Sequence, residues 1–152
     1  MSISDPGLAL IRLHNVDHLT YLHANHLLRQ YDITIQQALI LHYLATHKDS
    51  NINQKNIECY LGISNPSVTS LMKTLVNKHL IRRFPDRNDA RSYLLALTTH
   101  GQQLQKYIAD VFFDLSHNIC QNLTEEEMNQ LYHILNKMTS NLNTLLTNKT
   151  RA

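Results

Sequence analysis

The sequence predicts a mainly α-helical protein with one small β-hairpin, folded as a single domain over residues 1–152. Its 152 residues, 43% of them hydrophobic, match the length of one ordinary domain and are enough to bury a core. Three glycines and three prolines leave little room for long loops or glycine-rich phosphate-binding loops. Apolar residues recur at helical spacing through most of the chain, and two β-rich runs flank one polar loop.

The first two helices are predicted from apolar spacing and from one capping signal. From Gly7 to Tyr31 apolar residues occupy two sets of helical positions, so this helix needs neighbours on more than one side. The two sets are Leu8, Ile11, Leu19 and Leu22, and Leu10, Leu13, Val16 and Leu27. Thr34 followed by Gln37 is a capping box, which predicts a second helix that runs to about His47.

Residues 53–75 have the pattern of a helix-turn-helix. Asn53 can cap a short helix over Gln54–Leu61, which ends at Gly62, a residue able to take the left-handed conformation. Ser64 then serves as a cap, with Pro66 in the first turn of the next helix. The buried face of that helix is predicted to hold Val68, Leu71, Met72 and Leu75.

A β-hairpin is predicted next, followed by two long helices. Residues 81–84 and 93–97 are β-rich and are separated by a polar turn over residues 85–91. Thr99 with Gln102 is expected to cap the fifth helix, and Thr124 with Glu127 forms the capping box of the sixth. The apolar residues of the sixth helix are Met128, Leu131, Leu135, Met138, Leu142 and Leu145, spaced alternately by three and four.

Such a seam, sustained for about three heptads, needs a partner helix. Because both ends of the chain supply helices with surplus apolar surface, we expect this partner to belong to a second subunit. The interface would involve residues near 8–22 and 104–145. The alternative is that the sixth helix packs on the fifth helix of the same chain.

The charge of the chain is small but unevenly distributed. The chain has 14 Lys and Arg and 12 Asp and Glu, and the resulting net charge of +2 does not by itself indicate a binding partner. Residues 55–91, however, hold seven Lys or Arg and three Asp or Glu, and the arms on either side are close to neutral. This basic block indicates a nucleic-acid surface, with a solvated charged surface as the alternative.

The sequence predicts a cytoplasmic protein with no membrane segment. Its apolar runs are far shorter than the ~20 residues needed to cross a bilayer, and Met1–Leu13 lacks the pattern of a secretion signal. Cys59 and Cys120 lie 61 positions apart and belong to no CxxC or zinc-binding pattern. We expect both to be reduced, buried thiols.

The order of these elements resembles that of the MarR family of bacterial transcriptional regulators, from about Ala24 to Leu145. The most specific motifs are Leu80–Arg83, then Asp89–Arg91, then Leu97–Gly101, which are similar to the family's Asp-x-Arg wing and the Leu-Thr-x-x-Gly that follows it. The recognition-helix stretch, Ser64–Leu75, fits equally well. The segment Tyr31–Gly101 is most similar to repressors of multidrug efflux genes.

The resemblance implies a winged helix-turn-helix DNA-binding lobe over residues 33–97 and a helical dimerisation region over residues 8–31 and 99–147. It further implies a homodimeric repressor that binds double-stranded DNA at an inverted-repeat operator and is released by a small ligand. Two-fold symmetry would place the half-sites about one helical turn (~34 Å) apart. No catalytic residue, metal ligand or cofactor is expected.

The expected DNA contacts come from two elements. The helix that begins at Asn65 offers short polar groups suited to base edges and phosphates in a major groove. Arg87 and Arg91 at the hairpin tip are similar to the family's minor-groove wing, and Asp89 is expected to orient an arginine. The full set of predicted DNA-binding residues is Gln54, Lys55, Ser64, Asn65, Ser67, Thr69, Ser70, Lys73, Arg87, Asp89 and Arg91.

Three positions depart from the family pattern. His79 stands where the family usually has a glycine, so a histidine must hold a left-handed turn there. Glu58 stands where a small residue usually packs. Ser70 occupies a position that is often basic in relatives, so the family's base contact there is not carried over to this chain.

The family resemblance also predicts where a small aromatic or amphipathic ligand would bind. Asn15, His18 and Phe112 are expected to face a crevice between the dimer helices and the DNA-binding lobe, with Arg91 approaching from the wing. An aromatic ring, two polar groups and a cation suit an anionic phenol or a drug. The alternative is a crevice filled by the protein's own side chains.

Other function classes find less support in the sequence. No catalytic triad, HExxH motif or phosphate-binding loop is present, which argues against an enzyme. A metal sensor could use the pairs His14 with His18 and His23 with His26, each able to share a helix face. A redox sensor could use either cysteine, although neither has an evident basic neighbour. A winged-helix module that binds only protein is disfavoured by the arginines of the wing.

Overall fold

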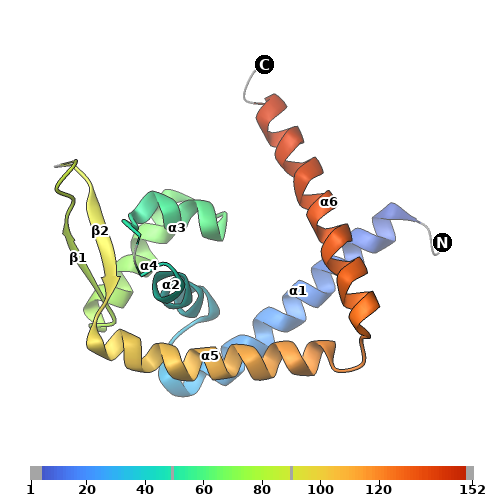
Figure 1. The fold of residues 1–152 in the computed structure, drawn as a ribbon, viewed down its shortest axis with the longest axis horizontal. Helices are drawn as coiled ribbons and strands as arrows, with labels where there is room; N and C mark the ends of the chain where they lie inside the picture. The colour runs from blue at the N-terminus through green and yellow to red at the C-terminus, as the bar shows by residue number, and fades with distance from the viewer. Residues whose placement is uncertain (1–4, 49, 90, 150–152) are drawn as a thin grey trace. The chain divides into compact units, whose positions relative to one another are not determined.

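The computed structural model describes residues 5–48, 50–89 and 91–149, which form helices and one two-stranded hairpin (Figure 1). The helices are α1 (Pro6–Leu28), α2 (Ile35–Thr46), α3 (Gln54–Leu61), α4 (Asn65–Asn77), α5 (Thr99–Cys120) and α6 (Glu125–Lys149). A 3-10 turn, η1 (Arg29–Tyr31), follows α1, and the strands are β1 (Ile81–Pro85) and β2 (Tyr93–Leu97). The mainly helical fold class is confirmed. The chain divides into two compact units, residues 1–115 and 116–152.

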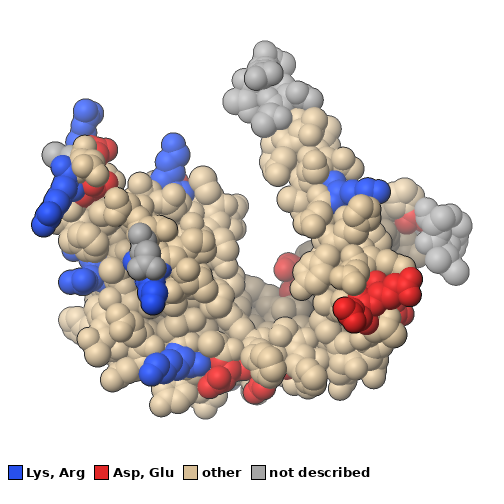
Figure 2. Space-filling model, in the orientation of Figure 1, with Lys and Arg blue, Asp and Glu red and all other residues tan. Residues whose placement is uncertain are grey.

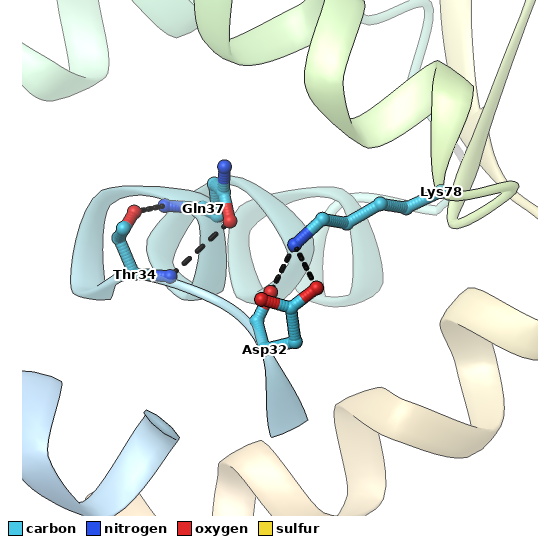
Figure 3. Close-up of polar contacts among 4 residues, drawn as sticks. All are labelled: Asp32, Thr34, Gln37 and Lys78. Carbon is cyan, nitrogen blue, oxygen red and sulfur yellow. Dashed lines mark hydrogen bonds and ion pairs between the residues drawn. The ribbon is translucent and has the colours of Figure 1, made fainter. Parts of the chain in front are cut away.

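Helix α1 ends three residues earlier than predicted, because the chain turns before α2. Asp32 has a left-handed backbone conformation with φ of 54°. The Lys78 ammonium donates to the main-chain oxygen of Asp32 and pairs with its carboxylate, with Nζ 2.9 Å from Oδ2 (Figure 3).

The predicted capping box of α2 is confirmed: the Gln37 N–H donates to Thr34 Oγ1, and the Thr34 N–H donates to Gln37 Oε1 (Figure 3).

The helix-turn-helix forms as predicted. Asn53 and Asn56 cap α3 reciprocally, and Gly62 ends it with φ of 63°. Ser64 stands at the N-cap of α4, although its hydroxyl lies 3.1 Å from Ser67 Oγ instead of accepting from a main-chain N–H. His79 follows α4 with φ of 54°, so a histidine does hold the left-handed turn predicted there.

The hairpin is antiparallel, with a register that runs from Ile81 opposite Leu97 to Pro85 opposite Tyr93. The Leu95 N–H also donates to the Ile52 carbonyl at 2.8 Å, which joins β2 to the segment that leads into α3. A main-chain hydrogen bond therefore joins the hairpin to the segment that leads into the helix-turn-helix.

The prediction that Thr99 caps α5 is wrong by one residue. Thr98 Oγ1 accepts from the Gly101 N–H at 3.0 Å and donates to the His79 carbonyl at 2.6 Å. This second bond is tertiary, so local spacing could not reveal which threonine caps the helix. A Cβ atom on Gly101 would lie 2.0 Å from the Leu80 carbonyl oxygen, which explains the glycine: α5 begins in direct contact with the start of β1.

The core lies among α2, α3, α4, the hairpin and the adjoining parts of α1 and α5. Its largest fully buried side chains are Leu28, Ile40, Leu41, Ile57, Val68, Met72, Leu75 and Ile108. Among the described residues, the buried polar side chains are Gln37, which caps α2, and Gln105, whose Nε2 lies 3.1 Å from His42 Nδ1.

Helix α6 makes up most of the second unit, residues 116–152. The predicted capping box is confirmed, because Glu127 accepts from the Thr124 N–H at 2.8 Å and the Glu127 N–H donates to Thr124 Oγ1 at 3.2 Å. The hydrogen bond from the Thr124 N–H, helped by one from its hydroxyl, lowers the pKa of the Glu127 carboxyl. None of the described side chains of α6 is buried.

The prediction that both cysteines are buried is wrong, because Cys59 is exposed and Cys120 is half-buried. Ile57 is the fully buried residue of α3, and a residue two positions further along a helix points to nearly the opposite side. Among the described residues, no helix is long and apolar enough to cross a membrane.

Candidate nucleic-acid interface

The exposed face of α4 is polar because its apolar residues are used in the core. Val68, Met72 and Leu75 are buried. The predicted contact residues on α4 and its cap are all exposed: Ser64, Asn65, Ser67, Thr69, Ser70 and Lys73. Pro66 lies in the first turn and removes one main-chain N–H group from the start of α4.

Side chains of α3 and α4 form one hydrogen-bonded cluster. Gln54 Nε2 donates to Thr69 Oγ1 at 2.8 Å and to Glu58 Oε1 at 3.3 Å. Asn65 Nδ2 donates to the same Glu58 oxygen at 2.5 Å, and Thr69 Oγ1 donates to Asn65 Oδ1 at 3.5 Å. The cluster ties the first turn of α4 to α3 and fixes how these groups face solvent.

The hairpin tip is shaped by its acidic residues. Asp89 Oδ1 accepts from the Arg91 N–H at 3.0 Å, and Asp86 Oδ1 accepts from the Asn88 N–H at 2.9 Å. Asp89 thus positions Arg91 through the main chain. Arg87 and Arg91 are exposed, as a DNA-contacting wing requires; Ala90, between Asp89 and Arg91, lies outside the described residues.

The hairpin, α3 and the start of α4 border an open polar hollow that is lined by residues of both charges. The lining residues are Asn53, Gln54, Lys55, Glu58, Asn65, Arg83, Asp89, Arg91, Ser92 and Tyr93. Arg83 lies over the Tyr93 ring, with its guanidinium carbon 5.1 Å from the ring centroid. Figure 2 shows lysine and arginine side chains along the hairpin and the helices beside it. The hollow therefore presents three cations and two carboxylates, together with amides that donate and accept hydrogen bonds.

Sequence reasoning did not assign Glu58 or Arg83 to this surface. The spacing of four between Gln54 and Glu58 could have indicated their contact on one helix face. The contact of Glu58 with Asn65 depends on the angle between α3 and α4, which no local pattern specifies.

The described contacts do not bring the predicted ligand-binding residues together. The His18 ring stacks on that of His14, with centroids 6.2 Å apart, and Asn15 is exposed on the same helix. The Phe112 and His42 rings pack in a T-shaped arrangement, with their centroids 5.8 Å apart. Arg91 instead lines the hollow beside α3. A ligand site built from these residues stays a prediction.

The described residues form no metal site and no disulfide. Among the described residues, no three His, Cys, Asp or Glu side chains lie close enough together to hold a metal ion. Cys59 and Cys120 are free thiols.

Comparison with known proteins assigns the family. A model of the MarR family matches residues 31–92. The structure of the MepR–DNA complex of S. aureus has 32% sequence identity to this chain and a TM-score of 0.80, covering 88% of this chain and 94% of MepR. The chain belongs to the MarR family. The resemblance predicted from the wing and recognition-helix motifs is confirmed.

Two further relatives agree with the assignment. This MarR-family chain is 28% identical over 145 residues to the multiple antibiotic resistance protein MarR of Escherichia coli, covering 90% of the chain and 97% of MarR. It is 26% identical over 108 residues to the transcriptional regulator SarZ of Staphylococcus epidermidis, covering 67% of the chain and 72% of SarZ. The chain is thus a winged helix-turn-helix DNA-binding transcriptional regulator and not an enzyme.

Proposed function

We propose that this MarR-family chain is a homodimeric repressor that binds an inverted-repeat operator, with α4 in the major groove and the hairpin tip in the adjacent minor groove. The observation that carries the proposal is the exposed polar face of α4 beside a hairpin whose tip exposes Arg87 and Arg91. The predicted DNA-binding residues would divide accordingly. Asn65, Ser67 and Thr69 face base edges, and Lys55, Lys73 and the arginines face phosphates or the minor groove.

Surplus apolar surface supports a homodimer. The first part of α1 exposes Leu10, Ile11, Val16, Leu19 and Leu22, and α6 exposes Leu131, Ile134, Leu142, Leu145 and Leu146. A monomer rarely leaves contiguous apolar surface of this kind in water. We propose that a second copy of the chain covers both surfaces and places the two α4 helices about one DNA turn (~34 Å) apart.

An electrophoretic shift assay with the DNA upstream of the chain's own gene tests the proposal. We expect one specific complex that contains two chains and protects an inverted repeat. If three or four cations of each protomer contact phosphates, the logarithm of the affinity should fall with the logarithm of salt at a slope of about −5 to −7. A slope near zero would refute DNA binding by the basic block.

MepR is described as a regulator of a multidrug efflux pump, and we propose that this chain likewise controls efflux genes and responds to a small aromatic or amphipathic ligand. The ligand would bind near Asn15, His18 and Phe112. It could release DNA only by binding more tightly to a dimer whose lobe spacing no longer matches the half-sites.

Titration with salicylate-like compounds and cationic dyes, followed by operator release and thermal shift, tests the ligand site. Binding should weaken in His18→Ala and Phe112→Ala. Unchanged binding in both variants would reject these residues as the site.

A further inference from the structure

Glu58 is a carboxylate within a surface that must approach a polyanion. It lies on α3, half-buried, and accepts hydrogen bonds from Gln54 and Asn65 through the same oxygen, Oε1. A carboxylate next to DNA raises the cost of approaching phosphates, so its presence needs a compensating role in recognition.

The hydrogen bonds around Glu58 determine what each amide has left to offer. A glutamine amide has two N–H donors, and both donors of Gln54 are used, one on Glu58 and one on Thr69. Gln54 can therefore present only its carbonyl oxygen to a ligand. Asn65 uses one donor on Glu58, which turns its Oδ1 toward Thr69.

The cluster as a whole is rich in acceptors. The Thr69 hydroxyl donates to Asn65, so its proton is not available to a base. The groups of this cluster that remain free to bond a base are Gln54 Oε1, Glu58 Oε2 and one N–H of Asn65. In the major groove only cytosine and adenine present an amino group, at N4 and N6, whereas guanine and thymine present carbonyl oxygens at the equivalent place.

We infer that Glu58 is a specificity-determining residue, which fixes the amides of Gln54 and Asn65 and makes this corner of α3 and α4 an acceptor for the amino group of cytosine or adenine. The inference rests on the proposed function, since it requires α4 to enter the major groove. Glu58 also lowers affinity for DNA that lacks the matching base, because its charge then faces phosphates and carbonyl oxygens without compensation.

Base selection from an operator library, with wild type and Glu58→Gln, tests this role. Wild type should enrich one base pair at one symmetry-related position in each half-site, with its cytosine or adenine on the strand that this corner of α3 and α4 contacts. Glu58→Gln keeps the size of the side chain but removes the charge and lets the amide network reverse. We expect the preference at that position to fall about tenfold and affinity for non-specific duplex to rise several-fold.

Asp110→Asn on α5 is the matched control, because Asp110 is exposed, lies outside the α3–α4 surface and changes the net charge equally. It should leave base preference unchanged. Gln54→Ala provides a second test, since it keeps the Glu58 charge and removes one acceptor. The preference of the protein for the selected base pair of the operator should then fall in part. Thermal unfolding of each variant verifies that the lobe is folded.

The outcomes separate the two claims. A wild-type preference that survives intact in Glu58→Gln overturns the role of Glu58 and leaves the proposed repressor function standing. A wild-type chain that selects no sequence at all refutes the proposed function, and this inference with it.

Discussion

The region from Ile33 to Leu97 and the two terminal helices use their apolar residues differently. In the first region Ile40, Ile57 and Leu75 are fully buried. In α1, Leu10 is 58% exposed and Leu19 is 64% exposed, and in α6 Leu145 is 62% exposed. Apolar residues at helical spacing thus have two destinations: a core made by the chain itself, and surfaces that a second copy is proposed to cover.

This difference also separates two kinds of stability. Burial of a leucine or isoleucine side chain stabilises a fold by about 1.5–3 kcal/mol, so the buried residues of the first region stabilise the single chain. In the proposed dimer, the exposed leucines of α1 and α6 would gain that free energy only on association, so the stability of the terminal helices should depend on protein concentration.

The largest effect is expected from truncation inside the core. Ile57→Ala should lower the free energy of unfolding by about 2–5 kcal/mol, because it leaves a cavity under α3 and α4. Leu10→Ala, at an exposed position, should change the unfolding of a dilute sample by much less. Urea denaturation of both variants at low concentration measures the contrast, and equal losses would break the distinction between the two regions.

The next largest effect should come from a charge in the α6 seam. Leu142→Asp would bury a carboxylate in the proposed dimer interface, so we expect the dimer dissociation constant to rise at least tenfold and operator binding to fall with it. Ser140→Asp adds the same charge on the other face of α6 and should change little. Sedimentation measures both; a Leu142→Asp dimer as tight as wild type would remove α6 from the interface.

A smaller effect is expected at the wing. Arg91→Ala removes one cation per protomer from the hollow beside α3, so the salt slope of DNA binding should become less steep by up to about 2. Ser67→Ala, on α4, should alter sequence preference more than the slope. Fluorescence anisotropy titrations at several salt concentrations give both values, and an unchanged slope in Arg91→Ala would place the wing away from phosphates.

The smallest effect concerns the start of α6. Hydrogen bonds from the Thr124 N–H and hydroxyl lower the pKa of Glu127 below its usual 4.5 in the folded chain. A carboxyl with a lowered pKa stabilises the folded state above about pH 4.5 and loses that contribution as the pH falls. Glu127→Gln still caps the helix but cannot titrate. Its melting temperature should therefore fall less than that of wild type between pH 7 and pH 3; parallel pH profiles would contradict this.

The elements that sequence could predict are those specified by local chemistry. The capping boxes at Thr34 and Thr124, the left-handed turn at Gly62 and the hairpin all depend on residues within a few positions of each other, and all were predicted. The structural features that were missed depend on distant partners. Thr98 caps α5 because it also reaches His79, and the chain turns at Asp32 beside Lys78, 46 residues away.

In the candidate DNA surface, too, the features set by local spacing were predicted and those set by tertiary packing were not. Spacing alone placed Asn65, Ser67 and Lys73 on one exposed face of α4, because the opposite face carries the core residues. The position of Glu58 between Gln54 and Asn65 could not be predicted, since it requires the packing of α3 against α4. Exposure of Cys59 was missed because a cysteine is apolar enough to fit either face of a short helix.

The mass of the wild-type chain in solution, alone and with operator DNA, tests the central claim most directly. Light scattering at micromolar concentration should give twice the 17.6 kDa chain mass, and the complex should contain two chains on one inverted repeat. A stable 17.6 kDa monomer, or one chain bound to each duplex, would contradict the claim that the exposed faces of α1 and α6 are covered by a second copy.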